Sequence, residues 1–208
     1  MTMLRPSKIV CVGRNYAEHA KELGNAVPEC PLLFFKPPSA LIGPGEAILL
    51  PAASARVEHE AEIGVVIGRR LRHASAAKAE AGIGGFTCVN DVTARDLQKV
   101  DGQWARAKGF DTFCPAGPAV VKGLDWRTLE VIGRVNGVER QRGNTAQMIF
   151  SIPDLLSYIS AIMTLEPGDL VATGTPAGVG PLSPGDVVEV EIPGIGVLSN
   201  PVRSEPQP

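Results

Sequence analysis

Hydrophobic and polar positions alternate most clearly between residues 56 and 68, in the run Arg-Val-Glu-His-Glu-Ala-Glu-Ile-Gly-Val-Val-Ile-Gly. A period of two predicts a β-strand whose side chains point alternately to two faces. One face would carry three carboxylates, Glu58, Glu60 and Glu62, and the other would carry mostly apolar side chains. Beyond Gly64 both faces are apolar, which indicates a strand that enters the core.

Other apolar runs predict a chain that is rich in short strands. They lie at residues 8–13, 32–36, 47–51, 84–91, 170–172 and 187–192, with a final short strand after residue 196. Within residues 131–138, the pair Asn136-Gly137 stands between β-prone residues and predicts a hairpin turn. Asp91 would lie at the end of its strand, before a polar turn.

Three segments carry helix signals. The first, residues 15–24, has the capping-box pattern Asn-x-x-Glu at its start and a glycine as its stop. The second, residues 75–81, is rich in alanine and has a serine at the cap position. The third begins after Ser151, and its apolar positions keep the 3.6-residue period of a helix packed on a core. Residues 106–108 are expected in a connection between elements.

Composition narrows the class of protein. The 208 residues include 23 glycines and 18 prolines, which suit strands joined by tight turns better than a helical bundle. The formal net charge of −2 provides no basic surface for nucleic acid. The four cysteines form no CxxC pair, so a zinc site is not expected. The sequence contains no run of about twenty apolar residues, so a membrane span is not expected. We therefore expect a soluble, β-rich protein of the reducing cytoplasm.

The acidic strand is the first candidate for chemistry. Carboxylates two residues apart at the edge of a core repel one another and lose solvation unless a cation neutralises them. The glutamates at positions 58, 60 and 62 are therefore candidate ligands for a hard divalent metal. The alternative is a solvated acidic strand end that binds nothing. Periodicity alone does not choose between these, and it does not say which glutamates would bind.

Two further segments have both a functional and an ordinary interpretation. On a helix over residues 15–24, His19 and Glu22 lie one turn apart, so the carboxylate can orient the imidazole and raise its basicity. The alternative is an incidental histidine on a solvated helix face. The small residues of the loop 173–180 would let backbone N–H groups approach an anion, although a tight strand connection has the same composition. Lys36 and Lys108 have, by themselves, the pattern of surface lysines.

Six separated motifs, taken together, resemble one family. They are Val12-Gly-Arg-Asn-Tyr-Ala-Glu-His19, Leu33-Phe-Phe-Lys-Pro37, His59-Glu-Ala-Glu-Ile-Gly64, Asn90-Asp-Val-Thr-Ala-Arg-Asp96, Met148-Ile-Phe-Ser-Ile-Pro153 and Thr173-Gly-Thr-Pro-Ala-Gly-Val-Gly180. In this order they resemble the fumarylacetoacetate hydrolase superfamily, most closely its short-chain acylpyruvase branch, the type called FAH domain-containing. The resemblance runs from about Ile9 to the last strand.

The resemblance implies a role for each matching residue. The metal ligands would be Glu60, Glu62 and Asp91, holding Mg²⁺ or Mn²⁺, and Glu58 would lie outside this set. The catalytic residues would be His19, Glu22 and Lys108, the first two on a helical lid within residues 1–30. The substrate contacts would be Arg14, Lys36, Gln98 and Thr175.

The resemblance also implies a reaction. A 2,4-dioxo acid offers a carboxylate oxygen and a keto oxygen to a hard cation. Water activated by His19, with Glu22 orienting the imidazole, would attack the far carbonyl, and pyruvate enolate would leave, stabilised by the metal and Lys108. The alternatives on the same site are oxaloacetate decarboxylation and isomerisation of the 2-hydroxyhepta-2,4-diene-1,7-dioate type. A non-catalytic, metal-stabilised interaction module is a third hypothesis, for which the dyad would have no use.

The fold implied is a β-rich α+β structure, a mixed β-roll with a few short helices. We expect a single catalytic domain over residues 1–208 and a homodimer. The expected partner is a small 2-oxo acid, with no nucleic acid and no membrane.

Overall fold

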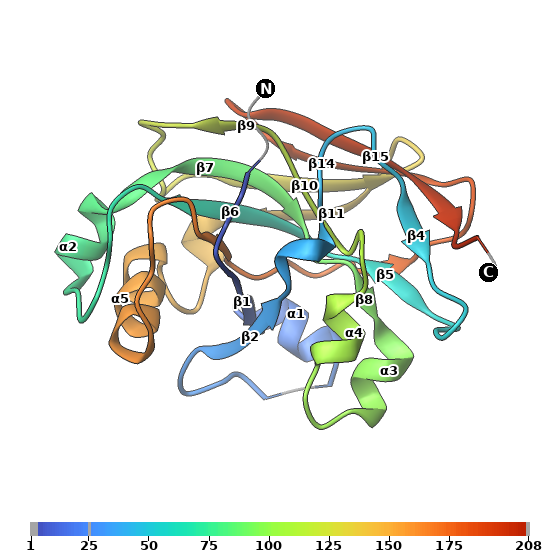
Figure 1. The fold of residues 1–208 in the computed structure, drawn as a ribbon, viewed down its shortest axis with the longest axis horizontal. Coiled ribbons are helices and arrows are strands. Elements are labelled where there is room, and N and C mark those ends of the chain that lie inside the picture. Colours follow the sequence, from blue (N-terminus) through green and yellow to red (C-terminus); the bar gives the residue numbers. More distant parts are fainter. Residues whose placement is uncertain (1–3, 25, 207–208) are drawn as a thin grey trace.

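The described part of the chain is built mainly from β-strands in three sheets (Figure 1). The computed structural model of the protein describes residues 4–24 and 26–206. The largest sheet has the strand order β2-β1-β12-β6-β7-β9-β3. Its strands are β1 (Ile9–Gly13), β2 (Leu32–Lys36), β3 (Leu41–Ile42), β6 (Ala61–Ile67), β7 (Ile83–Asn90), β9 (Cys114–Val121) and β12 (Leu170–Ala172).

The other two sheets are smaller and complete the mixed architecture. The second sheet, in the order β11-β10-β14-β15-β4, contains β4 (Ile48–Leu50), β10 (Glu130–Val135), β11 (Val138–Asn144), β14 (Val187–Ile192) and β15 (Gly196–Ser204). The third, in the order β13-β5-β8, contains β5 (Val57–His59), β8 (Thr93–Ala94) and β13 (Gly180–Pro181). Strand β1 runs parallel to β12 and antiparallel to β2, so parallel and antiparallel pairs share a sheet. The predicted β-rich fold of mixed sheets is confirmed.

The helices are short and lie in two groups. They are α1 (Ala17–Glu22), α2 (Ala76–Ala81), α3 (Arg95–Val100), α4 (Ala105–Gly109) and α5 (Ile152–Ile162), with 3₁₀ turns η1 (Pro38–Ala40) and η2 (Thr145–Gln147). Figure 1 shows α2 beside α5 at one end of the molecule, and α1, α3 and α4 together below the sheets. The second group carries several residues of the candidate site.

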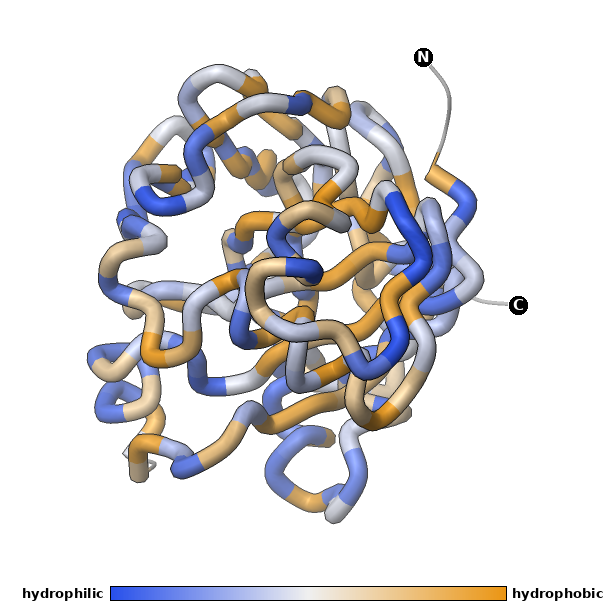
Figure 2. Tube along the Cα trace, turned by 90° about the vertical axis from the view of Figure 1, so that its left-hand side faces the viewer, coloured by the Kyte–Doolittle hydropathy of each residue, from blue (hydrophilic) through white to orange (hydrophobic). Residues whose placement is uncertain are grey.

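The largest hydrophobic cluster joins the inner faces of β6 and β7 to helix α5. Val65, Phe86 and Leu156 are buried members of this cluster. Figure 2 shows hydrophobic stretches through the centre of the molecule, with hydrophilic stretches mostly on the outer loops. Burial of Leu155, Leu156 and Ile159 agrees with the predicted 3.6-residue period of α5, whereas Ile162, predicted as part of the same apolar face, is exposed at the end of the helix.

Three local predictions are confirmed in detail. The hairpin β10–β11 turns at Asn136 and Gly137, whose φ angles of 53° and 73° are those of a type I′ turn. The hydroxyl groups of Ser75 and Ser151 accept hydrogen bonds from the first turns of α2 and α5. These signals are local, so the sequence pattern alone suffices to identify them.

Five predictions about elements are wrong or incomplete. The strand expected over residues 56–68 is interrupted at Glu60, which separates β5 from β6. Asn15 does not cap α1, because Tyr16 occupies the cap position, and the Asn15 amide instead bonds the backbone at Phe150 and Thr173. The polar turn after Asp91 and the connection around residues 106–108 contain helices α3 and α4, and the final strand is nine residues long rather than short.

Parts of the predicted lid segment and of the predicted domain are not described by the structure. Residues 1–3 and 25 of the predicted lid segment 1–30, and the last two residues of the predicted domain, lie outside the described residues. None of the described helices is both long and apolar enough to span a bilayer.

Candidate active site

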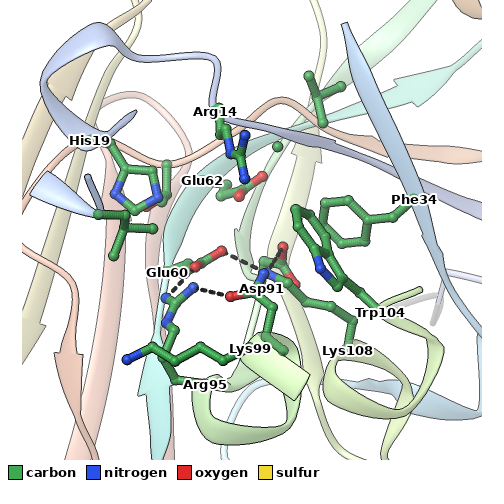
Figure 3. Close-up of a pocket in the computed structure, with 15 residues that line it drawn as sticks. Arg14, His19, Phe34, Glu60, Glu62, Asp91, Arg95, Lys99, Trp104 and Lys108 are labelled. Carbon is green, nitrogen blue, oxygen red and sulfur yellow. Dashed lines mark hydrogen bonds and ion pairs between the residues drawn. The ribbon is translucent and has the colours of Figure 1, made fainter. Parts of the chain in front are cut away.

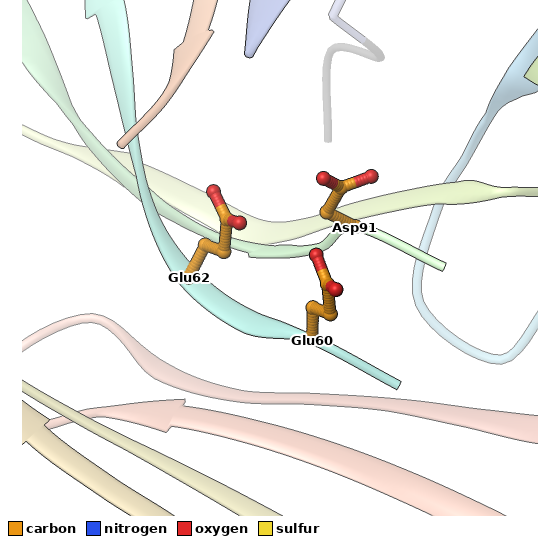
Figure 4. A group of neighbouring side chains, drawn as sticks. All are labelled: Glu60, Glu62 and Asp91. Atoms are coloured by element: carbon orange, nitrogen blue, oxygen red, sulfur yellow. The ribbon is translucent and has the colours of Figure 1, made fainter. Parts of the chain in front are cut away.

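Three carboxylates meet where strand β6 begins and strand β7 ends. One oxygen each of Glu60, Glu62 and Asp91 lies within 4.8 Å of the other two, and all three residues are buried (Figure 4). The antiparallel register explains this convergence, because Glu62 stands opposite Val89 and the backbone N–H of Asp91 donates to the carbonyl of Glu60 at 2.9 Å. Two segments far apart in the chain are thus joined at one point.

The interruption of the strand at Glu60 has a visible cause. The Asn90 side chain accepts the Glu60 backbone N–H at 3.0 Å, in the place of a backbone partner. Beyond this point β5 leaves the large sheet and pairs with β8 and β13. The Glu60 carboxylate is therefore held at the junction of two sheets, beside Asp91.

The buried cations Lys108 and Arg95 compensate part of this negative charge. Lys108 Nζ lies 2.8 Å from Glu60 and 2.7 Å from Asp91, and Arg95 Nη2 lies 2.6 Å from Glu60 (Figure 3). Burial alone would raise the pKa of Glu60, but Lys108 and Arg95 outweigh it and hold that pKa well below its usual range. Burial lowers the pKa of Lys108, yet Asp91 and Glu60 more than offset this and the net change is upward. Lys108 is therefore a cation in this setting.

Glu62 is the carboxylate that the cations leave uncompensated. Its described polar contact is the backbone N–H of Gly174, which donates to Oε2 at 2.8 Å. Burial, together with the charges of Asp91 and Glu60, raises the pKa of Glu62 well above its usual range. A fully buried carboxylate in this position needs additional positive charge to stay ionised.

The donor set fits a hard divalent cation. Three carboxylates converge with no thiolate or imidazole among them, which is the chemistry that Mg²⁺ and Mn²⁺ prefer. A cation bound there by Glu60, Glu62 and Asp91 would neutralise the negative charge of Glu62, which burial and the two neighbouring carboxylates otherwise disfavour.

Glu58 shares the acidic face but belongs to a different set of contacts. Its two oxygens accept from Arg56 Nε at 2.6 Å and from Arg95 Nε at 2.7 Å. Arg95 thus bridges Glu58 and Glu60, and arginines engage both oxygens of Glu58. This contact gives a structural reason why Glu58 lies outside the cluster.

Lys36 is not where the sequence analysis expects it. Its ammonium is buried behind Asp91, 2.7 Å from Oδ1, and it donates to the backbone carbonyls of Val92, Lys108 and Phe113 at 2.7–2.9 Å. It does not line the cavity described below. With every N–H of the ammonium engaged, Lys36 holds Asp91 and the end of α4 in place, so the predicted contact with substrate is replaced by a structural role.

The predicted dyad of His19 and Glu22 is assembled on α1. Glu22 Oε2 lies 3.2 Å from His19 Nδ1, and the backbone N–H of Gly178 donates to both oxygens of Glu22, at 3.0 and 3.2 Å. When Nδ1 carries the proton and donates it to Glu22, Nε2 is left as an acceptor. The histidine is buried and lines the same cavity as the three carboxylates.

This cavity, of about 250 Å³, brings most of the predicted site together. Figure 3 shows His19, Arg14 and Lys108 around the carboxylates, and Gln98 and Thr175 also line the cavity. Of the predicted contacts, Gln98 Oε1 already accepts from Arg95 Nη1 at 2.6 Å. The Thr175 hydroxyl donates to the Ala61 carbonyl at 2.9 Å and accepts from Gln141 at 2.7 Å.

The comparisons with known proteins agree with this geometry. Residues 8–203 match the family model described as Fumarylacetoacetate (FAA) hydrolase C-terminal. This chain belongs to the fumarylacetoacetate hydrolase family. The predicted resemblance is thereby confirmed, and the protein belongs to a family of enzymes.

Three similar members of the family show its range. The solved structure of 5-carboxymethyl-2-hydroxymuconate delta-isomerase from Mycobacterium smegmatis is 49% identical, with a TM-score of 0.91 over 99% of this chain and 81% of that one. That of 2-hydroxyhepta-2,4-diene-1,7-dioate isomerase from Mycobacterium marinum is 48% identical, also at 0.91, over 99% of this chain and 77% of that one. The mitochondrial oxaloacetate tautomerase FAHD2A of Homo sapiens is 44% identical over 95% of this chain and 67% of that protein.

Several residues in and next to this site are not predicted from the sequence. Arg95 lies inside the motif Asn90–Asp96. Its positive charge was the one available signal, because a row of buried glutamates needs a cation. Gln141 had no local signal, although its side chain joins His59, the Ala61 N–H, Thr175 and Pro176. The edge-to-face pair of Phe34 and Trp104, with ring centres 5.3 Å apart, forms the apolar wall of the cavity and could not be read from spacing.

Proposed function

We propose that this protein catalyses keto–enol isomerisation of small 2-oxo diacids. The observation that carries this proposal is the placement of a buried histidine and three buried carboxylates around one cavity. A 2-oxo acid exposes adjacent carboxylate and keto oxygens, which suit an oxygen-binding cation, and it exchanges a proton at the neighbouring carbon. The site offers a position for each function.

The metal and Lys108 would act on the negative charge of the substrate. When bound, a divalent cation supplies Lewis-acid stabilisation of an enolate oxygen. Lys108 provides a fixed positive charge at the same end of the cavity, because its ammonium is buried between Glu60 and Asp91. Arg14 lines the cavity close to Glu62 in Figure 3 and is positioned to meet the carboxylate next to the keto group.

His19 would move the proton. Glu22 fixes Nδ1 as the donor, so Nε2 can take a proton from carbon 3 of the keto form while the electron pair of that C–H bond becomes the C–C double bond. The protonated imidazole then gives a proton to the enolate oxygen, and the reverse sequence returns the keto form. Glu22 stabilises the imidazolium between these steps.

The names of the similar proteins support this assignment. One relative is named an oxaloacetate tautomerase and two solved structures are named isomerases of unsaturated diacids. These activities share an enolate or dienolate of a 2-oxo diacid and differ in where the proton returns. A single cavity with one base is sufficient for such chemistry.

A substrate panel tests the proposal. The protein would be assayed with Mg²⁺, with Mn²⁺ and with chelator on the enol form of oxaloacetate and on 2-hydroxyhepta-2,4-diene-1,7-dioate, with ultraviolet absorbance as the readout. We expect metal-dependent loss of enol absorbance with at least one diacid. Absence of any rate above the metal-only control on every member would contradict the proposal.

Hydrolysis of a C–C bond in acylpyruvates or fumarylpyruvate is the second candidate function. The observation that favours it is the double contact of Glu22 with the Gly178 N–H, which fixes the dyad in an arrangement suited to activating water. Acetylpyruvate would then yield pyruvate and acetate. Unchanged ultraviolet absorbance of acetylpyruvate with enzyme and Mg²⁺ would rule against this candidate.

Decarboxylation of oxaloacetate can be separated from both reactions. It releases carbon dioxide and leaves pyruvate enolate, and it needs no attacking water. A His19→Ala variant that still releases carbon dioxide at the full rate would reveal an activity that does not use the dyad.

A further inference from the structure

Two cationic side chains on the cavity wall have no anionic partner among the described residues. Arg95 and Lys108 are held by the buried carboxylates, at 2.6–2.8 Å. Arg14 and Lys99 also line the cavity, but neither side chain forms a hydrogen bond or ion pair within residues 4–24 and 26–206. Positive charges that are held near a cavity without internal compensation attract anionic groups of a ligand.

The two cations lie at different depths and in different directions. Arg14 is half-buried and follows β1, and Figure 3 shows it near Glu62. Lys99 is exposed and belongs to α3, one helical turn beyond Arg95. In Figure 3 the Lys99 side chain runs beside Arg95, on the other side of the carboxylates from Arg14. Lys99 therefore stands at the mouth of the cavity.

We propose that Lys99 binds the second carboxylate of a dianionic substrate, the one remote from the 2-oxo group, and thereby selects diacids over monoacids. This inference rests on the proposed function in one respect, namely that the cavity accepts a 2-oxo acid. One carboxylate of such a ligand would meet Arg14 and the cation that Glu60, Glu62 and Asp91 would hold. The other carboxylate meets the free ammonium of Lys99.

The remaining walls leave few other partners for the second carboxylate. Across the cavity, Phe34 and Trp104 present an apolar surface. On the α3 side, Arg95 is occupied by Glu58 and Glu60, and Gln98 accepts from Arg95 through its carbonyl oxygen. Lys99, with a flexible stem and three N–H donors, is the cation on that side that can reorient toward an incoming anion.

A matched pair of ligands measures this preference without turnover. In 2-oxoglutarate the last carbon is a carboxylate, and in 2-oxopentanoate it is a methyl group, while both chains have five carbons and the same 2-oxo acid head. Their dissociation constants would be measured by calorimetry with Mg²⁺ present, for the wild-type protein, Lys99→Met, Lys99→Arg and the control Lys78→Met. Lys78 is an exposed lysine on α2, outside the lining of this cavity.

The inference predicts a specific pattern. Lys99→Met should weaken the binding of 2-oxoglutarate about 5- to 10-fold, the range for one charge-assisted hydrogen bond discounted for exposure. It should change the dissociation constant of 2-oxopentanoate less than twofold. Lys99→Arg should restore most of the affinity for the diacid, and Lys78→Met should resemble wild type. Equal loss for both ligands, no loss for the diacid, or a wild-type protein that binds both ligands equally would each overturn the inference.

Failure of the inference and failure of the proposed function give different results. Selective, Lys99-dependent binding of 2-oxoglutarate without turnover of any diacid would uphold the subsite and reject isomerisation. Turnover of a diacid with the same KM in Lys99→Met and wild type would uphold isomerisation and reject the subsite.

Discussion

At the scale of the residue, His19 and Glu60 have separate tasks and should fail separately. His19 contacts Glu22 and the cavity, whereas Glu60 is a buried carboxylate beside Asp91. We expect His19→Asn to lower turnover about 10²- to 10⁴-fold, the usual contribution of a positioned base, and to change metal affinity less than twofold. Glu60→Gln should lose both turnover and metal affinity. Turnover would be measured by steady-state kinetics and metal affinity by calorimetry on the same variants.

The control for this comparison is His73→Asn. His73 is exposed and lies outside the cavity lining, so its replacement should leave both quantities unchanged. A His19→Asn variant with full turnover would contradict the assignment of the base.

Gln141 is predicted to stabilise the segment around Thr175, which lines the cavity. Its oxygen accepts from His59 and from the Ala61 N–H, and its nitrogen donates to Thr175 and Pro176, all at 2.7–3.0 Å. Gln141→Leu would leave several buried polar groups without partners. We expect a loss of about 2–4 kcal/mol in the free energy of unfolding, measured by urea denaturation.

Gln103→Leu, at an exposed position, provides the comparison and should cost less than about 0.5 kcal/mol. Equal free energies of unfolding for the two variants would show that the hydrogen bonds of Gln141 do not stabilise the fold.

At the scale of the element, the loop between β12 and β13 is expected to determine whether the dyad is ordered. Gly178 has a φ of 101°, and a Cβ there would overlap the Arg140 carbonyl oxygen. Gly178→Ala should therefore cost about 3 kcal/mol or more, and it should lower turnover because the Glu22 contacts are lost. Denaturation curves and kcat would be measured on the same preparation.

Gly185→Ala separates backbone strain from steric overlap. Gly185 has a similar φ of 96°, but a Cβ added there would meet no atom within 4 Å, so only the backbone cost of about 1–2 kcal/mol is expected. If Gly178→Ala is no worse than Gly185→Ala in stability and activity, the link from this loop to Glu22 is wrong.

The elements also show which features the sequence could and could not predict. The strand over residues 187–192 and the Asn136-Gly137 hairpin depend on local periodicity and turn chemistry, and both are found. The break at Glu60 depends on the Asn90 side chain, far along the chain, and no local pattern carries that information. Similarly, α4 is fixed partly by Lys36, whose ammonium binds the Lys108 carbonyl.

The candidate site follows the same division. The motifs contain His19 and the three carboxylates, and helical spacing places Glu22 one turn from His19. They do not locate Arg95 as the bridge between two glutamates, and they assign Lys36 to the substrate although it lies behind Asp91. Such roles depend on which groups tertiary packing buries together.

At the scale of the whole molecule, metal binding should stabilise the fold. Glu62 is buried and forms no ion pair within the described part of the chain, and its pKa is raised, so a divalent ion that binds the native carboxylates shifts the unfolding equilibrium by mass action. At about 100 times the dissociation constant, Mg²⁺ should add about 2.7 kcal/mol, seen as a saturable rise in Tm. The variant Glu62→Gln should show a smaller rise, and equal rises would place the stabilising ion elsewhere.

The homodimer remains a prediction at this scale, and so does the single domain over residues 1–208. Sedimentation equilibrium would report a mass of about twice 21.9 kDa for a dimer. A mass equal to that of one chain at micromolar concentration would contradict the prediction.

The most direct test of the central claim is the rate at which the wild-type protein converts enol to keto oxaloacetate, followed by ultraviolet absorbance. The claim is that a metal held by Glu60, Glu62 and Asp91 works with His19 on one substrate. It predicts catalysis with Mg²⁺ or Mn²⁺, loss of catalysis with chelator and recovery when metal is returned. A rate that chelator leaves unchanged, or no catalysis in any metal, would contradict it.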